Sequence, residues 1–187
     1  MKRQHQLLLI GSTLAFSWLA MQAVHELGHV LGAVVTGGRA VEVFLHPLGI
    51  SYTRCEPNPQ PLLVVWAGPI VGVALPIAAL LAARRFKLRG WYVFQFFAGF
   101  CLVANGAYLA FGSLGETGDA GDLLRHDAPL LLLWLFGLAT IPLGFWLWNG
   151  LGPNFGLGVA GGRVDPVVAY VMVGLVVVTV TLELTFA

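Results

Sequence analysis

The sequence predicts an all-α polytopic membrane protein with about five transmembrane helices and a small β-hairpin between the first two spans. Two observations indicate this fold class. The 187-residue chain is 58% hydrophobic and only 10% charged, whereas a soluble protein is about 25% charged. The apolar residues are also gathered in stretches of about 20 residues, the length that a bilayer core requires. We therefore expect one integral-membrane domain over residues 1–187.

Five apolar stretches are long enough to cross a membrane. They are Leu7–Val35, Pro61–Ala83, Trp91–Gly112, Pro129–Trp148 and Val167–Phe186. The first is longer than one crossing needs, so we expect it to tilt or to protrude from the bilayer. A basic start, an apolar middle and small residues near Ala23 also resemble a cleaved signal peptide. The apolar run continues through Val35, which favours an uncleaved helix.

The segment between the first two spans is predicted to form a β-hairpin beside the membrane. Gly37 and Gly38 end the first helix. The runs VEVFL and GISYTR, within Val41–Arg54, are rich in β-branched and aromatic residues, and Pro47 and Gly49 separate them. Such runs with turn residues between them are typical of a hairpin.

The distribution of lysine and arginine predicts the orientation in the membrane. The loop RRFKLR (Arg84–Arg89) holds four positive charges between the second and third spans, so we expect it in the cytoplasm. Lys2 and Arg3 lie two crossings away and would be on the same side. The hairpin would then lie on the outer side. The net charge of +1 gives no reason to expect a nucleic-acid partner.

Three ionisable residues interrupt the first apolar run. His25, Glu26 and His29 form the pattern H-E-x-x-H, a signature of zinc proteases. Positions i and i+4 share a helix face, so both histidines can aim a nitrogen at one cation. Zn²⁺ takes imidazole ligands at about 2.0–2.1 Å. Glu26 can accept a proton from a water molecule whose pKa zinc lowers to about 7.

The membrane setting makes a chance occurrence of this pattern improbable. The same spacing does recur by accident in soluble helices. In a hydrocarbon run, however, an ionisable residue costs roughly 2.5–3.5 kcal/mol and is kept mainly for function. Gly28 and Gly32 also suit close helix packing around such a site. We therefore predict a Zn²⁺ cofactor bound by His25 and His29.

A catalytic zinc site requires a third protein ligand and one open position. The candidates lie in the hairpin, in the segment GETGDAGDLLRHDAP and in the loop before the last span. They are His46, Asp119, Asp122, His126, Asp127 and Asp165. Asp119 and Asp122 can also be read as a solvated acidic helix N-terminus, which the helix dipole favours.

With these motifs, the chain resembles the site-2 protease family of intramembrane zinc metalloproteases over about residues 7–135. The H-E-x-x-H motif matches at His25–His29. WAGPIVG (Trp66–Gly72) resembles the motif of the family's second span. GDAGDLL (Gly118–Leu124) resembles the family's L-D-G-G-x-x-L turn, with Asp119 at the aspartate position. The additional span at about 167–186 lies outside the resemblance.

The resemblance implies an enzyme, a zinc metalloendopeptidase that cleaves peptide bonds in transmembrane or juxtamembrane segments. It implies Glu26 as the catalytic residue and His25, His29 and Asp119 as metal ligands. Its partners would be a membrane-protein substrate, the lipid bilayer and a regulatory membrane partner, because the chain has no insertion large enough for a PDZ domain. The expected location is the cell membrane of a bacterium.

The chain departs from the family in two respects. The family's turn usually reads N-x-x-P-x-P-x-L-D-G, whereas here Asn105 lies fourteen residues before Asp119 with no proline between them. Asp122 therefore stays an alternative third ligand. The family's site usually lies toward the cytoplasm, whereas the charge distribution puts His29 toward the outside. That conflict stays open at this point.

Other polar residues allow further interpretations. Asn105 either holds a substrate or hairpin strand or makes a hydrogen bond between helices. Glu183 is expected to snorkel or to face water. The alternative function is a non-proteolytic membrane scaffold or carrier that keeps the metalloprotease fold, but the presence of Glu26 favours the enzyme. A metal transporter is disfavoured because the spans offer few further ionisable residues for an ion path.

Overall fold

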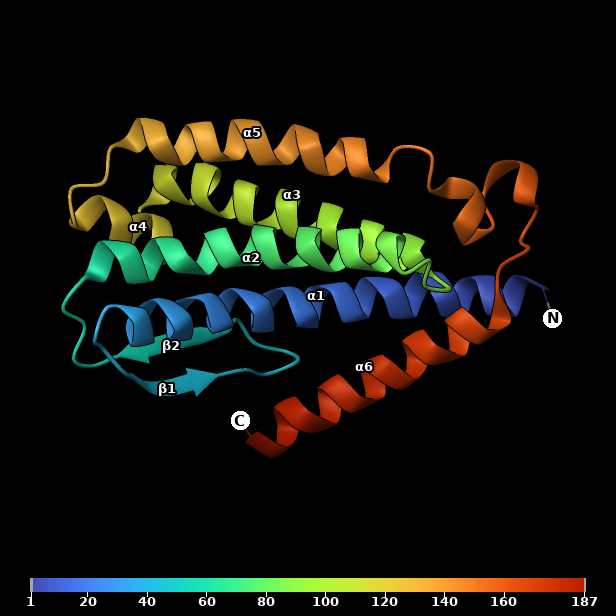
Figure 1. Ribbon diagram of the computed structural model, residues 1–187, viewed down its shortest axis with the longest axis horizontal. Helices are drawn as coiled ribbons and strands as arrows, with labels where there is room; N and C mark the ends of the chain where they lie inside the picture. The colour runs from blue at the N-terminus through green and yellow to red at the C-terminus, as the bar shows by residue number, and fades with distance from the viewer. Residues whose placement is uncertain (1, 187) are drawn as a thin grey trace.

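A computed structural model describes residues 2–186 and confirms the predicted fold class (Figure 1). Its five long helices are α1 (Lys2–Val35), α2 (Pro61–Arg85), α3 (Trp91–Gly115), α5 (Leu130–Trp148) and α6 (Pro166–Phe186). All five are long and apolar enough to cross a membrane. The two strands are β1 (Ala40–Phe44) and β2 (Tyr52–Cys55), and they lie between α1 and α2.

Four of the five long helices extend beyond the apolar stretches that predicted them. α1 begins at Lys2 rather than Leu7, and α2 continues to Arg85 rather than Ala83. α3 ends at Gly115, three residues later than expected. Hydropathy marks the part of a helix that contacts lipid, whereas backbone hydrogen bonding continues through polar residues at its ends. The sequence therefore located the spans but underestimated the lengths of most of the helices.

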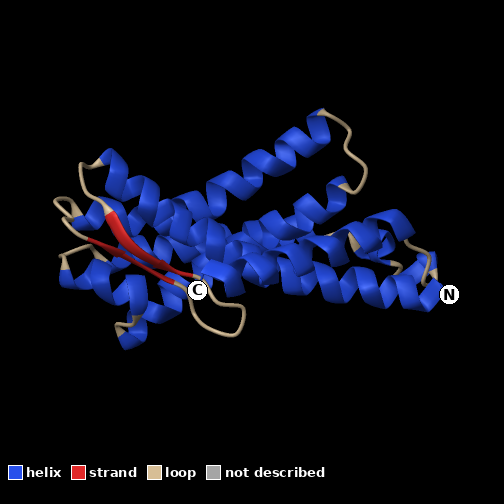
Figure 2. Ribbon diagram, turned by 90° about the horizontal axis from the view of Figure 1, so that it is seen from below, coloured by secondary structure: helices blue, strands red, loops and turns tan. Residues whose placement is uncertain are grey.

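The hairpin is antiparallel and lies along the C-terminal half of α1 (Figures 1 and 2). Glu42 pairs with Arg54, and Phe44 pairs with Tyr52. An irregularity between Ala40 and Glu42 shifts the register near the start of β1. Both strands pack on α1, and β2 brings its side chains beside the H-E-x-x-H motif.

A short helix that the sequence did not predict precedes the fourth span. α4 (Gly118–Arg125) is separate from α5. The chain leaves α4 through Asp127, whose φ of 62° is left-handed. Pro129 then disfavours a helical conformation at the residue before it. Two 3₁₀ turns, η1 (Gly152–Phe155) and η2 (Gly158–Ala160), shape the loop before α6.

The packing order of the helices determines where the site lies. α1 packs on α2, α2 on α3, and α3 on α5, while α4 lies against α2 and α3. α6 packs on the other side of α1 and runs obliquely toward the hairpin (Figures 1 and 2). The expectation that Glu183 faces water is wrong, because its side chain is only 6% exposed. The C-terminal end of α6 lies near the hairpin, and Glu183 is buried there.

Candidate metal centre

The two histidines of α1 converge on one carboxylate. His25 Nε2 lies 2.7 Å from Asp119 Oδ2, and His29 Nε2 lies 3.2 Å from the same oxygen. Both histidines are 7% exposed. The ligand atoms of the three residues all lie within 4.8 Å of one another, so the group could hold a metal ion. The i and i+4 spacing places both rings on one face of α1, as expected.

The other nitrogen of each ring is held by an oxygen acceptor. His25 Nδ1 lies 2.7 Å from Asn105 Oδ1, and His29 Nδ1 lies 2.9 Å from Val64 O. Asn105 Nδ2 donates to Cys101 O at 2.8 Å, so Oδ1 is the atom that faces His25. Both Nδ1 atoms must therefore carry the hydrogen. In the neutral rings, both Nε2 atoms then carry lone pairs directed at the same point.

Asp119 reaches the histidines from the first turn of α4. Its backbone N–H donates to Tyr108 Oη at 3.1 Å, which ties α4 to α3. Burial by itself raises the pKa of the Asp119 carboxyl, but when His25 and His29 are protonated, their hydrogen bonds and charge outweigh burial and hold that pKa well below its usual range. The carboxylate is therefore ionised and available as an oxygen ligand.

None of the other candidate ligands joins this group within the described residues. Asp122 pairs with Arg125, and its backbone carbonyl accepts from His126 Nδ1 at 2.8 Å. Asp165 pairs with Arg89 in the loop between α2 and α3. His46 lies in the hairpin loop, and Asp127 is exposed. The structure thus brings Asp119, and not Asp122, to the histidines.

Glu26 faces the hairpin rather than lipid. Its Oε1 accepts from Ser51 Oγ at 2.7 Å, and its Oε2 accepts from Thr53 Oγ1 at 2.7 Å. Gln22 Oε1 also accepts from the Ser51 backbone N–H at 2.9 Å. The Glu26 side chain is only 4% exposed. Sequence reasoning missed Ser51 and Thr53, although alternate residues of a strand point to one side and GISYTR carries hydroxyls at that spacing.

The second helix makes room for the rings with two glycines. A Cβ at Gly68 would collide with His29 and would lie 2.9 Å from His25 Nε2. A Cβ at Gly72 would lie 2.8 Å from Asn105 Oδ1. Gly68, Gly72 and Val64, whose carbonyl accepts from His29, recur every four residues along one face of α2. The WAGPIVG motif therefore provides the space in which the histidines and Asn105 are placed.

Gly28 and Gly32 bring α1 close to this face. A Cβ at Gly28 would collide with Ala67 O, and a Cβ at Gly32 would lie 2.7 Å from Ala67 Cβ. The close packing predicted for these two glycines is confirmed. The alternatives for Asn105 are also resolved in part, because its side chain joins α3 to α1 by a hydrogen bond.

Two cavities meet at the site. A polar one of about 450 Å³ lies between α1, β2 and α4, and its lining includes His29, Thr53 and Asp119. An apolar one of about 500 Å³ lies between α1 and α3, and its lining includes Trp18 and Phe111. Both share a boundary formed by His25, Glu26, Ile50, Ser51 and Tyr108. Glu26 thus lines both the polar and the apolar cavity.

Comparisons of the chain with protein-family models, with curated proteins and with solved structures gave no match. The function is therefore argued from the geometry of the chain itself. Five helices are long and apolar enough to make a multi-pass membrane protein plausible. Within this bundle, His25, His29 and Asp119 form a buried group that could hold a metal ion.

Proposed function

We propose that this chain is an intramembrane zinc metalloprotease related to the site-2 protease family. The observation that carries the proposal is a buried carboxylate, Glu26, directly beside a group of two imidazoles and one carboxylate that opens into a cavity. The reaction would be hydrolysis of a peptide bond in a transmembrane or juxtamembrane segment. The expected setting is the cell membrane of a bacterium.

The donor set of the site fits Zn²⁺. Two imidazole nitrogens and one carboxylate oxygen are typical ligands of a catalytic zinc, which keeps a fourth position for water or substrate. A tetrahedral ion with bonds of about 2.0–2.1 Å separates its ligands by roughly 3.3 Å. The separation of 3.2 Å between His29 Nε2 and Asp119 Oδ2 agrees with this value. The 2.7 Å between His25 Nε2 and Asp119 Oδ2 is a hydrogen-bond distance.

The hydrogen bonds around the rings suit metal binding at both Nε2 atoms. Because Asn105 and Val64 fix the protons on Nδ1, each neutral ring offers a lone pair at Nε2. Two lone pairs and a carboxylate oxygen at one point repel each other unless protons or a cation lie between them. Outer hydrogen bonds of this kind accompany almost all metal-ligating histidines.

Glu26 would act as the general base. Zn²⁺ supplies Lewis acidity and lowers the pKa of a water molecule to about 7. Glu26 would take a proton from the attacking water and later pass it to the leaving amine. Ser51 and Thr53 donate to its two oxygens and so hold the carboxylate in one orientation. The hairpin thereby contributes to the orientation of the catalytic group.

The two cavities suggest how a substrate would lie. A transmembrane helix hides its carbonyls in its own hydrogen bonds, so it must unwind before it can be cleaved. The polar cavity between α1, β2 and α4 can accept the exposed backbone. The adjoining apolar cavity between α1 and α3 can accept apolar side chains next to the scissile bond. The partners are therefore a membrane-protein substrate and the surrounding bilayer, with regulation left to a separate membrane protein.

The test uses purified protein in liposomes with a labelled single-pass membrane substrate. We expect about one zinc ion per chain in the wild type and loss of that zinc in His25→Ala/His29→Ala. Glu26→Gln should keep the zinc and lose about 10²–10⁴-fold in cleavage rate, because an amide cannot accept the proton. Glu42→Gln, at a half-buried hairpin glutamate that pairs with Arg54, is the matched control and should cleave normally.

Two results would contradict the proposal. Equal zinc content in the wild type and the double histidine variant would remove the metal site. Zinc retention together with undiminished cleavage by Glu26→Gln would remove Glu26 as the base. A wild-type chain that binds zinc but cleaves no membrane substrate would favour the scaffold or carrier alternative.

A further inference from the structure

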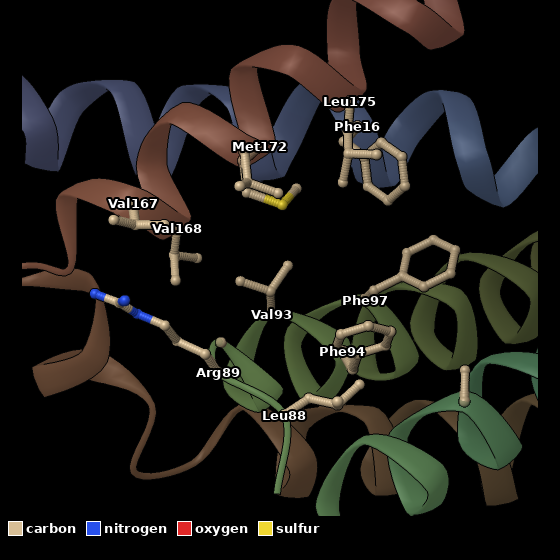
Figure 3. Close-up of a pocket in the computed structure, with 13 residues that line it drawn as sticks. Phe16, Leu88, Arg89, Val93, Phe94, Phe97, Val167, Val168, Met172 and Leu175 are labelled. Atoms are coloured by element: carbon tan, nitrogen blue, oxygen red, sulfur yellow. The ribbon is translucent and has the colours of Figure 1, made fainter. Parts of the chain in front are cut away.

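α6 leaves an apolar cavity between itself and α3, away from the metal centre. Figure 3 shows Val93 and Phe97 of α3 turned toward the same space as Met172 and Leu175 of α6, with Phe16 of α1 at one side. The cavity holds about 480 Å³. Its lining is almost entirely aliphatic and aromatic, so it offers water no hydrogen-bond partners.

The protein itself does not close this cavity. Among the long helices, α6 packs against α1, while its face toward α3 borders the cavity. The α6 residues that line it run from Val167 to Leu175, which is about 12 Å along a helix axis. An apolar space of this volume lies within the range of small-ligand pockets, so it can hold part of a hydrocarbon chain.

One end of the cavity lies at the loop Arg84–Arg89, which carries a cluster of positive charges. Leu88 and Arg89, from the loop between α2 and α3, line that end (Figure 3). Arg89 donates from Nε and Nη2 to the two carboxylate oxygens of Asp165 at 2.6 and 2.8 Å. These hydrogen bonds lower the pKa of Asp165, which therefore stays ionised. The ion pair leaves the charge of Arg89 neutralised.

The rest of the loop keeps an excess of positive charge. Arg84 lies over the ring of Trp91, with its Cζ 5.1 Å from the ring centroid. Arg85 and Lys87 are exposed, and neither forms a salt bridge within the described part of the chain. Basic clusters at the end of a transmembrane helix attract anionic lipid head groups.

We propose that this cavity binds one acyl chain of an anionic glycerophospholipid, whose phosphate lies against the Arg84–Arg89 loop. The apolar lining suits a hydrocarbon chain, and the excess charge of Arg85 and Lys87 complements the head group. A peptide is a poor occupant, because the lining offers no polar groups for its backbone. The bound chain would fill the space between α6 and α3.

The test measures binding of phosphatidylglycerol and phosphatidylcholine with identical acyl chains to the full-length protein in detergent, by native mass spectrometry. We expect phosphatidylglycerol to bind more tightly to the wild type. Each cation contributes about 5-fold to this preference, so Arg85→Gln/Lys87→Gln should reduce it by about 30-fold. The control Arg39→Gln/Arg54→Gln removes two cations beside the hairpin and should keep the preference.

A second pair of variants tests the cavity itself. Val171→Trp places a large ring in the cavity, where it should displace part of the acyl chain. Loss of only two buried methylenes of that chain should weaken binding of either lipid by about 15-fold. Val178→Trp is the matched control, because Val178 lies two turns further along α6 and is 55% exposed, against 54% for Val171. Equal binding of the two lipids by the wild type would overturn the head-group assignment. Equal lipid binding by Val171→Trp and Val178→Trp would overturn the cavity.

Discussion

At the scale of single residues, one hydrogen bond per ring decides what the H-E-x-x-H motif can do. A histidine in an apolar helix is satisfied when both nitrogens have partners. Here Asn105 Oδ1 and Val64 O accept hydrogen bonds from the Nδ1–H groups of His25 and His29. The remaining Nε2 lone pairs then meet the ionised carboxylate of Asp119. That arrangement calls for a positive charge at the centre, which ring protons or a metal ion could supply.

The first prediction separates the two aspartates. Asp119→Ala should lose zinc, because it removes the only carboxylate that approaches both Nε2 atoms in the described structure. Asp122→Ala should retain zinc, because Asp122 pairs with Arg125 instead. A zinc titration of both variants checks this, with circular dichroism as the control for folding. Zinc loss in Asp122→Ala alone would show that α4 presents the other carboxylate.

The second prediction concerns Asn105, which contacts His25 but does not belong to the group of ligand atoms. Asn105→Ala should weaken zinc binding by about 10–100-fold, because the His25 ring loses the acceptor that fixes its proton. Asn105→Asp keeps an acceptor oxygen at the same position and should restore most of the affinity. Both affinities can be measured by competition with a chelator. Equal losses in the two variants would mean that the amide acts through packing alone.

At the scale of elements, the face of α2 that carries Gly68 and Gly72 determines the position of the site. Side chains at these positions would occupy the space of the imidazoles and of Asn105. Gly28 and Gly32 allow α1 to approach the same face. Small residues permit such close contact between membrane helices. At these glycines the two helices therefore leave space for the His25, His29 and Asn105 side chains.

The third prediction tests this face by adding one methyl group. Gly68→Ala should weaken zinc binding sharply, because the new Cβ collides with the His29 ring. Gly11→Ala is the matched control, because a Cβ added at this position of α1 would meet nothing within 4 Å. In a helix, alanine is usually favoured over glycine by about 0.5–1 kcal/mol. Gly11→Ala should therefore keep zinc and lose no thermal stability. Unchanged zinc affinity in Gly68→Ala would show that α2 yields to the added methyl.

At the scale of the whole molecule, charge is divided between the two ends of the bundle. Arg3, the Arg84–Arg89 loop and Arg163 lie in segments at one end, where Gln6 donates to Phe155 O and Arg89 pairs with Asp165. The hairpin and α4 lie at the other end, together with most of the acidic residues. The positive-inside rule predicts that the basic end faces the cytoplasm. The candidate metal centre would then lie toward the opposite side.

The fourth prediction follows from that asymmetry. Leu48→Cys places a thiol in the hairpin loop, where Leu48 is 93% exposed. Lys87→Cys places one in the basic loop. A membrane-impermeant maleimide applied to intact cells should label Leu48→Cys only, and both should react after the cells are opened. Each variant would carry Cys55→Ser and Cys101→Ser to remove the native thiols. The reverse pattern would place the metal centre toward the cytoplasm, as the family resemblance implies.

The sequence by itself determined the spans, the hairpin and the pairing of His25 with His29. These features depend on local patterns: apolar length, alternation in a strand and the i, i+4 spacing of a helix. The sequence also restricted the third ligand to a few residues. It could not show that α4 is a separate helix or that Glu183 is buried, because both depend on how distant segments pack.

Only the tertiary structure decided which groups complete the centre. Asp119 lies 94 residues from His25 in the sequence, and Asn105 lies 80 residues from it. The Val64 carbonyl has no signature in the sequence, because every residue carries one. Ser51 and Thr53 reach Glu26 only because β2 packs on α1. Local propensity cannot specify such contacts, since they form only when helices from distant parts of the chain pack together.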